Sequence, residues 1–145
     1  KHILLSKINR FVLTKLVAEV YMYAPKTLLP REIERLGAKV AKSREEAIEG
    51  ADGVMGLRIQ LERQHGGLFP SLSEYSKFYG VKDGLLKYAK KDAVILHPGP
   101  VNRGVELTPT LIDGETSVIE EQVTCGAAVR MALLKLLSEY RENNL

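Results

Sequence analysis

The stretch Ala93-Val94-Ile95-Leu96-His97-Pro98-Gly99-Pro100 is the most informative part of this chain for its fold class. Its first four residues are apolar and two of them are β-branched, which is typical of a strand covered on both faces. The strand ends abruptly, because each proline fixes φ and removes a backbone N–H donor. An apolar strand that leads into a rigid turn fits a parallel sheet, where ligands bind beyond the carboxyl ends of the strands.

Outward from this stretch, strand-like and helix-like segments alternate along the chain. Strands are expected at residues 19–23, 38–40, 53–57 and 93–96, and helices at 7–16, 27–36, 44–48, 72–78, 82–88 and about 126–140. Ser43 and Glu46 have the spacing of a capping box, and residues 60–71 have the composition of a loop. The alternation predicts an α/β fold, with a three-layer, Rossmann-like parallel sheet flanked by helices.

Length and composition fit a single domain over residues 1–145. Apolar residues make up 45% and charged residues 27%, so the chain can build a core without disulfides. The net charge is only +3 and no block of Lys and Arg occurs, which argues against a nucleic-acid partner. No apolar run approaches the length of a membrane span. Cys125 has no second cysteine to pair with, which favours a cytoplasmic location, and we expect a buried, inert thiol.

Arg58 and Gln60 follow the expected strand at residues 53–57 and stand two residues apart. In an extended backbone their side chains point the same way. An arginine binds a carboxylate bidentately, and a glutamine amide both donates and accepts hydrogen bonds. The alternative is an ordinary surface pair beside Glu62 and Arg63, and position alone favours that alternative.

The turn at residues 97–100 is the second candidate site. Its prolines leave backbone carbonyls free to accept hydrogen bonds from a ligand NH₂ group, although a plain strand exit without a ligand fits equally well. No second histidine lies near His97 in the sequence. We therefore expect His97 to be a structural histidine that is hydrogen-bonded to the backbone rather than a general base.

Motifs of other enzyme classes are missing from the sequence. Neither a GxGxxG fingerprint nor a Gly-Lys-Ser/Thr phosphate loop is present, which argues against a dinucleotide-binding domain. The serines lack the context of a nucleophile elbow, and no metal-ligand spacing occurs.

Three motifs follow one another in a specific order along nearly the whole chain. They are Gly56-Leu57-Arg58-Ile59-Gln60-Leu61-Glu62-Arg63, then His97-Pro98-Gly99-Pro100-Val101-Asn102-Arg103-Gly104-Val105-Glu106, then Gln122-Val123-Thr124 with Gly126 and Val129-Arg130-Met131-Ala132. Together they resemble the aspartate-binding half of the catalytic chain in the aspartate carbamoyltransferase family. The related ornithine enzymes carry a Cys-containing turn where residues 97–100 stand here.

The resemblance implies a reaction in pyrimidine biosynthesis, in which the α-amine of L-aspartate attacks carbamoyl phosphate to give N-carbamoyl-L-aspartate and phosphate. Arg58 would bind an aspartate carboxylate, and Gln60 would help to position it. The Gly99 and Pro100 carbonyls would accept hydrogen bonds from the carbamoyl NH₂ group. His97 and Arg103 would support the site. The family's turn has a cis peptide, which we expect at Gly99–Pro100. Catalysis of this kind relies on orientation and charge stabilisation, without a metal or cofactor.

Two features depart from the family pattern. Lys1-His2-Ile3-Leu4 stands where the family has Lys-His-Ser-Arg, so Leu4 replaces an arginine that grips aspartate. Loss of such a charged hydrogen bond costs ~1.5–3 kcal/mol. The family's carbamoyl-phosphate domain is also missing, and so is a strand before Lys1 that lies in the middle of the family's sheet. The resemblance further implies a homotrimer formed through the missing domain, and a terminal helix that packs against it.

Two hypotheses follow from these observations. The chain is the aspartate-binding portion of an aspartate carbamoyltransferase, inactive on its own and functional with the missing part. Alternatively, it is a non-catalytic remnant or interaction module of the same fold, which the substitution at Leu4 would favour.

Overall fold

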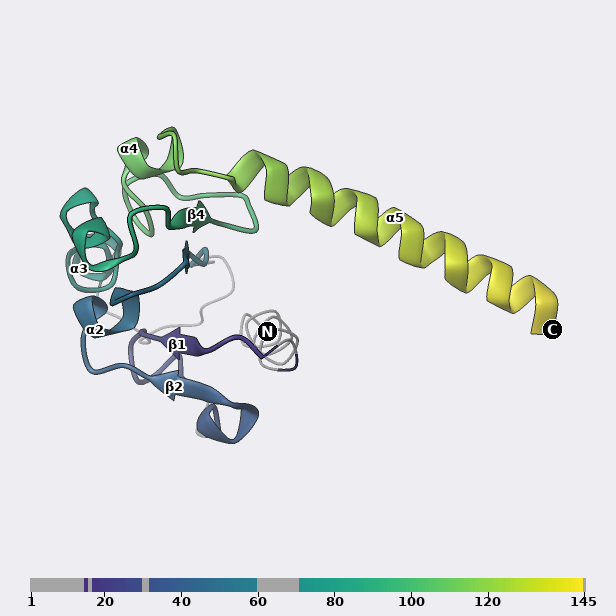
Figure 1. Ribbon diagram of the computed structural model, residues 1–145, viewed down its shortest axis with the longest axis horizontal. Coiled ribbons are helices and arrows are strands. Elements are labelled where there is room, and N and C mark those ends of the chain that lie inside the picture. The colour runs from purple at the N-terminus through teal and green to yellow at the C-terminus, as the bar shows by residue number, and fades with distance from the viewer. Residues whose placement is uncertain (1–14, 16, 30–31, 60–70, 145) are drawn as a thin grey trace.

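The computed structural model describes residues 15, 17–29, 32–59 and 71–144 (Figure 1). Within these residues the strands are β1 Val20–Met22, β2 Ala38–Val40, β3 Gly53–Met55 and β4 Val94–Leu96. The α-helices are α2 Arg44–Ile48, α3 Leu72–Phe78, α4 Pro109–Ile112 and α5 Ile119–Asn144, and the 3₁₀ helices are η1 Glu34–Leu36 and η3 Asp83–Tyr88. The four expected strands are confirmed, each slightly shorter than or equal to its predicted length.

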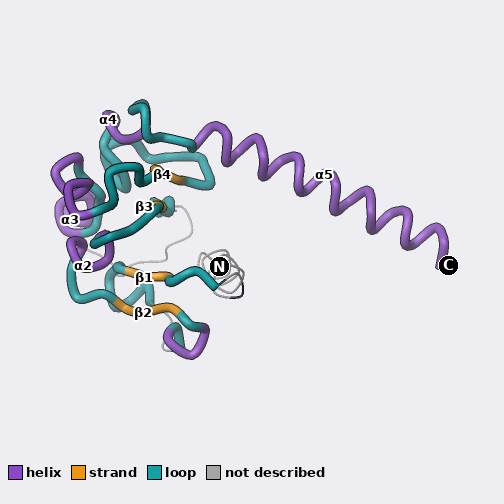
Figure 2. Tube along the Cα trace, viewed as in Figure 1, coloured by secondary structure: helices purple, strands orange, loops and turns teal. Residues whose placement is uncertain are grey.

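The strands form two separate parallel sheets of two strands each. β1 pairs with β2, with Tyr21 opposite Lys39, and β3 pairs with β4, with Val54 opposite Ile95. In Figure 2 the strands follow one another in the order β2, β1, β3 and β4. No pairing joins β1 to β3 among the described residues. The predicted α/β class with parallel strands is thus confirmed, but the described strands do not form one continuous sheet.

The hydrophobic core lies around the β3–β4 sheet. Ile95 on β4 and Leu107 on the following loop are fully buried. The remaining members of the cluster are Ile48, Val54, Leu85 and Ile119, which come from α2, β3, η3 and the start of α5. Because these elements are far apart in sequence, the core fixes the base of every loop that leaves the carboxyl ends of β3 and β4.

Ser43 caps α2 as predicted, since its Oγ accepts a hydrogen bond from the Glu46 N–H at 3.1 Å. The reciprocal half of the motif differs from the expected one. The Glu46 carboxylate accepts from the N–H of Lys42 at 2.7 Å, one residue before the cap. Both bonds satisfy amides at the amino-terminal end of a short helix, which has little other support.

The helix predicted at residues 27–36 is wrong. The described part contains a turn, closed by the Leu28 N–H and the Pro25 carbonyl at 2.8 Å, and only the 3₁₀ helix η1. The sequence has a proline at position 30, and a proline disfavours the α conformation of the residue before it and does not fit inside a helix. The helix end at Gly37 is confirmed, with a φ of 84° that suits glycine.

Helix α5 begins at Ile119, well before the predicted start near residue 126. Glu120 and Glu121 lie in its first turn, where acidic side chains favour the positive end of the helix dipole. The rest of α5 extends away from the sheets (Figure 1). Large apolar side chains are exposed along it, namely Val129, Met131, Leu133, Leu134, Leu136, Leu137 and Tyr140. This agrees with the expected apolar face without a partner.

The short helix α4, which has Pro109 in its first turn, was not predicted from the sequence. The predicted helix at residues 7–16 and the predicted loop up to residue 70 fall outside the described residues, apart from Lys15. In the described part of the chain, no helix combines the length and the apolar character needed to span a membrane.

Candidate functional site

The candidate site lies where the chain leaves β3 and β4. These strands are parallel neighbours, so their carboxyl ends meet at the same edge of the sheet. The Gly56 N–H donates to the Leu96 carbonyl at 2.9 Å and extends the pairing beyond β3. Arg58 therefore leaves the sheet beside His97, as the sequence predicted for these two loops.

The two loops approach each other closely at Gly56. A Cβ atom at this position would lie 3.0 Å from Cγ of Leu107 and 3.2 Å from Cδ2 of His97. Such distances are tighter than ordinary van der Waals contact, so a larger residue would push the loops apart. Gly56 thus allows the segment that carries Arg58 to pack directly against the imidazole of His97.

His97 is fully buried, and both its ring and its backbone N–H are hydrogen-bonded. Its Nδ1 accepts the Gly99 N–H at 3.0 Å, which confirms the expected hydrogen bond to the backbone. Its own N–H donates to Oε1 of Gln122 at 2.8 Å, and Gln122 lies in the first part of α5. Through these bonds, His97 and Gln122 hold the turn at residues 97–100 against α5.

The imidazole of His97 is neutral at ordinary pH. Burial, followed by the positive charge of Arg58, lowers the pKa of His97 from 6.5 to about 4. Because Nδ1 accepts a hydrogen bond, the proton of the neutral ring lies on Nε2. This Nε2 is buried and has no hydrogen-bond partner among the described residues.

The turn after His97 has the expected backbone. The Gly99–Pro100 peptide is cis, which confirms the prediction for this bond. Gly99 has a φ of 68°, a conformation that glycine adopts without steric cost. Gly99 is half-buried and Pro100 is exposed. The predicted carbamoyl-binding turn is thus partly accessible from the solvent.

The remaining predicted site residues differ in their placement. Arg58 is half-buried, and its charge acts on His97. Arg103 is exposed and forms a two-pronged ion pair with Asp113 after α4, including a bond of 3.0 Å from Nη1 to Oδ1, so its guanidinium faces Asp113. Gln60 and Leu4 fall outside the described residues.

Sequence reasoning missed two residues behind the site, Glu106 and Asn102. The Glu106 side chain is buried, with 3% of the residue exposed, and its Oε1 accepts the Ile59 N–H at 2.9 Å. Asn102 is hydrogen-bonded to the same carboxylate and to the Ile59 carbonyl. The available signal was an acidic residue between Val105 and Leu107 in the second motif, because a charge in an apolar setting needs partners.

The expectation of a buried Cys125 is wrong, since this thiol is exposed. Cys125 lies on α5, which leaves the core after its first turn, so no other element of the described residues covers it. Among the described residues, no cluster of His, Cys, Asp or Glu side chains has the arrangement needed to hold a metal ion.

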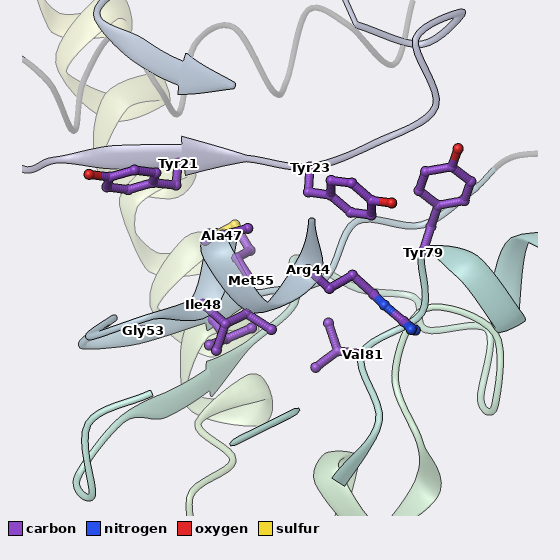
Figure 3. Close-up of a pocket in the computed structure, with 10 residues that line it drawn as sticks. Tyr21, Tyr23, Arg44, Ala47, Ile48, Gly53, Met55, Tyr79 and Val81 are labelled. Carbon is purple, nitrogen blue, oxygen red and sulfur yellow. The ribbon is translucent and has the colours of Figure 1, made fainter. Parts of the chain in front are cut away.

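A separate open pocket of about 130 Å³ lies between the two sheets (Figure 3). Tyr21 and Tyr23 line it from the β1 side, and residues 53–55 of β3 line it from the other. Arg44 also contributes to the wall, but its Nη1 donates to the carbonyls of Lys77 and Gly80, both at 3.0 Å. The pocket thus separates β1 from β3 and lies apart from the loops that carry Arg58 and His97.

Comparison with known proteins places this arrangement in a family. The family model described as aspartate/ornithine carbamoyltransferase, Asp/Orn binding domain, matches residues 7–137. The aspartate carbamoyltransferase catalytic subunit of Ruminiclostridium cellulolyticum is 58% identical over 137 residues, which are 94% of this chain and 44% of that protein. The corresponding subunit of Caldanaerobacter subterraneus subsp. tengcongensis is 53% identical over 140 residues, 97% of this chain and 46% of that protein. The chain thus spans less than half the length of these curated relatives.

Solved structures show the same fold at lower sequence identity. Ornithine carbamoyltransferase from Thermus thermophilus has a TM-score of 0.67 at 22% identity, over 81% of this chain and 39% of that one. Aspartate transcarbamoylase from Trypanosoma cruzi, in complex with carbamoyl aspartate and phosphate, has a TM-score of 0.62 at 23% identity, over 79% and 38% of the two chains. Together with the family match over most of the sequence, these findings show that the chain belongs to the aspartate/ornithine carbamoyltransferase family and carries its Asp/Orn binding domain.

Proposed function

We propose that the chain supplies the aspartate-binding half of an aspartate carbamoyltransferase, which joins L-aspartate to carbamoyl phosphate in pyrimidine biosynthesis. The observation that carries the proposal is the meeting of Arg58 with the turn at residues 97–100 at one edge of the β3–β4 sheet. The names of the relatives that are more than 50% identical favour aspartate over ornithine as the amino-acid substrate.

In this proposal the two loops have complementary roles. The Arg58 guanidinium binds an aspartate carboxylate, with Gln60 on the same loop. The Gly99 and Pro100 carbonyls accept hydrogen bonds from the NH₂ group of carbamoyl phosphate, and neutral His97 holds the turn in place. Rate acceleration then comes from the orientation of the attacking amine and from charge stabilisation. Arg103 has at most a supporting role while it pairs with Asp113.

The second part of the proposal is that the chain works together with a region it does not contain. A strand between β1 and β3 would join the two sheets into one. The pocket that separates the sheets and the absence of pairing between these strands in the described residues support this idea. The exposed apolar side chains of α5 support it as well, since an isolated domain rarely leaves so many uncovered. We expect the chain alone to be inactive.

A homotrimer is the expected assembly of the completed enzyme. The proposal places the contacts between subunits in the missing region, so this chain alone should not form trimers. Sedimentation of the completed enzyme and of the chain alone would test this directly. A trimer of the isolated chain would contradict the assignment of the contacts to the missing region.

The test of the proposed function uses a hybrid enzyme. The matching segment of the Ruminiclostridium cellulolyticum subunit, which is 58% identical, is replaced by this chain. N-carbamoyl-aspartate formation is then measured for the hybrid and its Arg58→Ala variant. We expect the aspartate KM to rise by ~10–150-fold, the range for loss of a hydrogen bond to a charged group.

The control is Arg35→Ala, because Arg35 is an exposed arginine whose guanidinium pairs with nearby Glu32. This variant should leave the KM unchanged. An Arg58→Ala variant with an unchanged aspartate KM would overturn the role of Arg58. An inactive but folded hybrid would favour a non-catalytic remnant instead.

A further inference from the structure

A buried carboxylate links the two site loops through a small hydrogen-bond network. Oε1 of Glu106 accepts the Ile59 N–H at 2.9 Å and Nδ2 of Asn102 at 2.9 Å. Oε2 of Glu106 accepts the Asn102 N–H at 3.0 Å. Asn102 Nδ2 also donates to the Ile59 carbonyl at 3.1 Å. Both polar backbone groups of Ile59 are therefore held by the loop that follows β4.

The donors of the network suit the Glu106 side chain. The Ile59 N–H, the Asn102 N–H and the Asn102 amide all point N–H groups at its two oxygens, and a carboxylate offers acceptor sites on both. The negative charge also acts on a neighbour, since burial, followed by the charge of Glu106, raises the pKa of Tyr75 to about 12. A buried carboxylate that lost these donors would be left with a large desolvation cost.

The network acts on Arg58 because Ile59 is the next residue in the chain. The Ile59 N–H belongs to the peptide that joins Arg58 to Ile59, so a bond to this N–H fixes ψ of Arg58 and the origin of its side chain. Asn102 lies two residues after Pro100, and its own N–H is held by the same carboxylate. One carboxylate therefore sets the backbone of the arginine loop relative to the turn at residues 97–100.

We infer that Glu106 and Asn102 are positioning residues, which hold Arg58 at a fixed place relative to the carbamoyl-binding turn. This inference rests on the proposed function. Neither residue needs to touch the substrate, because each acts through the backbone on either side of the site. Orientation of this kind matters because a shift of about 1 Å in a reacting or clamping group can lower a rate by ~100-fold.

The first experiment measures the network itself in the chain as it exists. Hydrogen exchange of the Ile59 and Asn102 amides is compared between the unaltered chain, Glu106→Gln and the control Glu49→Gln, whose side chain is exposed after α2. We expect faster exchange of at least one of the two amides in Glu106→Gln only, since a glutamine keeps one acceptor oxygen and turns an NH₂ group towards the other N–H. Unchanged protection in Glu106→Gln would overturn the network.

The second experiment separates positioning from a purely structural role, using the active hybrid enzyme. Glu106→Gln and Asn102→Ala should each raise the aspartate KM by about 10–100-fold, while the KM for carbamoyl phosphate stays within about threefold. In an Arg58→Ala background, the same substitutions should have little further effect, because the group that they position is already missing.

The outcomes distinguish a failure of the positioning role from a failure of the proposed function. Full additivity of Glu106→Gln and Arg58→Ala in an active enzyme would overturn the positioning role and leave the proposed function intact. Equal losses for both substrates would also overturn it, because they indicate a general disturbance of the fold. An unaltered hybrid without activity would overturn the proposed function, and with it the role of Glu106, while the exchange data would still report on the network.

Discussion

The two parallel sheets of this molecule are built alike and yet are stabilised very differently. At the centre of the β3–β4 sheet, Ile95 has none of its surface exposed, and residues from four other elements surround it. In the β1–β2 sheet, Tyr21 is 40% exposed and Val40 is 37% exposed. The exposed side chains of Lys39 and Glu19 form an ion pair there at 2.9 Å.

The difference shows that pairing of strands alone does not produce a stable sheet. Backbone hydrogen bonds in β1–β2 exchange solvent partners for protein partners and contribute little net free energy. Burial of apolar side chains provides most of the stabilisation, and here it is concentrated around β3 and β4. The candidate site lies at the edge of the well-buried sheet, where its loops have a fixed base. Four predictions test this contrast, in order of decreasing effect.

The largest effect is expected from truncating the core of the β3–β4 sheet. Ile95→Ala should lower the free energy of unfolding by about 4 kcal/mol, through lost burial and the cavity that remains. The matched change in the other sheet, Val40→Ala, should cost less than about 1 kcal/mol, because the side chain is already partly exposed. Urea unfolding of both variants measures the difference. Similar costs for the two would refute the contrast between the sheets.

The next effect is a pH dependence that originates at His97. Its pKa in the folded protein is about 4, below 6.5, so protonation favours the unfolded chain. The stability that neutral His97 contributes is present above pH 6.5 and is lost as the pH falls towards 4, by roughly 3 kcal/mol at most.

The measurement for this prediction is the free energy of unfolding between pH 7 and pH 4, for the unaltered chain and for His97→Gln. Carboxylates titrate in both proteins, so the difference between the two curves isolates the histidine. We expect the variant to show the flatter curve. Parallel curves would mean that His97 is not held in its neutral form.

A smaller effect is expected where the segment after α3 contacts the site loop. A Cβ at Gly80 would lie 2.4 Å from the Val105 carbonyl oxygen and 2.7 Å from that of Ser76, and both obstacles are backbone atoms. Gly80→Ala should therefore cost about 1–3 kcal/mol. Gly84→Ala is the control, since nothing lies within 4 Å of its Cβ position. Chemical denaturation of the pair tests this, and equal stabilities would contradict the close packing.

The smallest effect is expected from the exposed ion pair of the β1–β2 sheet. Lys39→Gln removes the contact with Glu19, in which both side chains are more than half exposed. The melting temperature should change by no more than about 3 °C, and the change should vanish in 1 M salt. A large, salt-independent decrease would show that the sheet depends on Lys39 in some other way.

Local features of the fold followed the sequence closely. The four strands, the cap at Ser43 and the turn at residues 97–100 were predicted, because each depends on neighbours within a few residues. The helix expected at residues 27–36 was wrong, because a proline is poorly tolerated inside a helix and one stands at position 30. The start of α5 at Ile119 was not predicted, because Val118 and Ile119 are β-branched and such residues favour strands.

The candidate site also has a part that the sequence predicted and a part that only the structure shows. Arg58, Gly99 and Pro100 were identified in the sequence, through the loops that follow apolar strands and through the family resemblance. Their mutual placement was expected from parallel pairing, but the means of holding them was not. Glu106 was noted as part of the second motif but was given no role, since nothing in a linear pattern indicates that its carboxylate reaches Ile59, 47 residues earlier in the chain.

The sequence by itself determined the strands, the rigid turn and the family, because these depend on local backbone preferences and on residues in a fixed order. Only the tertiary structure decided that His97 is buried and neutral, that Cys125 is exposed and that Glu106 links the two loops. Burial and long-range hydrogen bonds arise when distant segments exclude water from one another, and no short stretch of sequence contains that information.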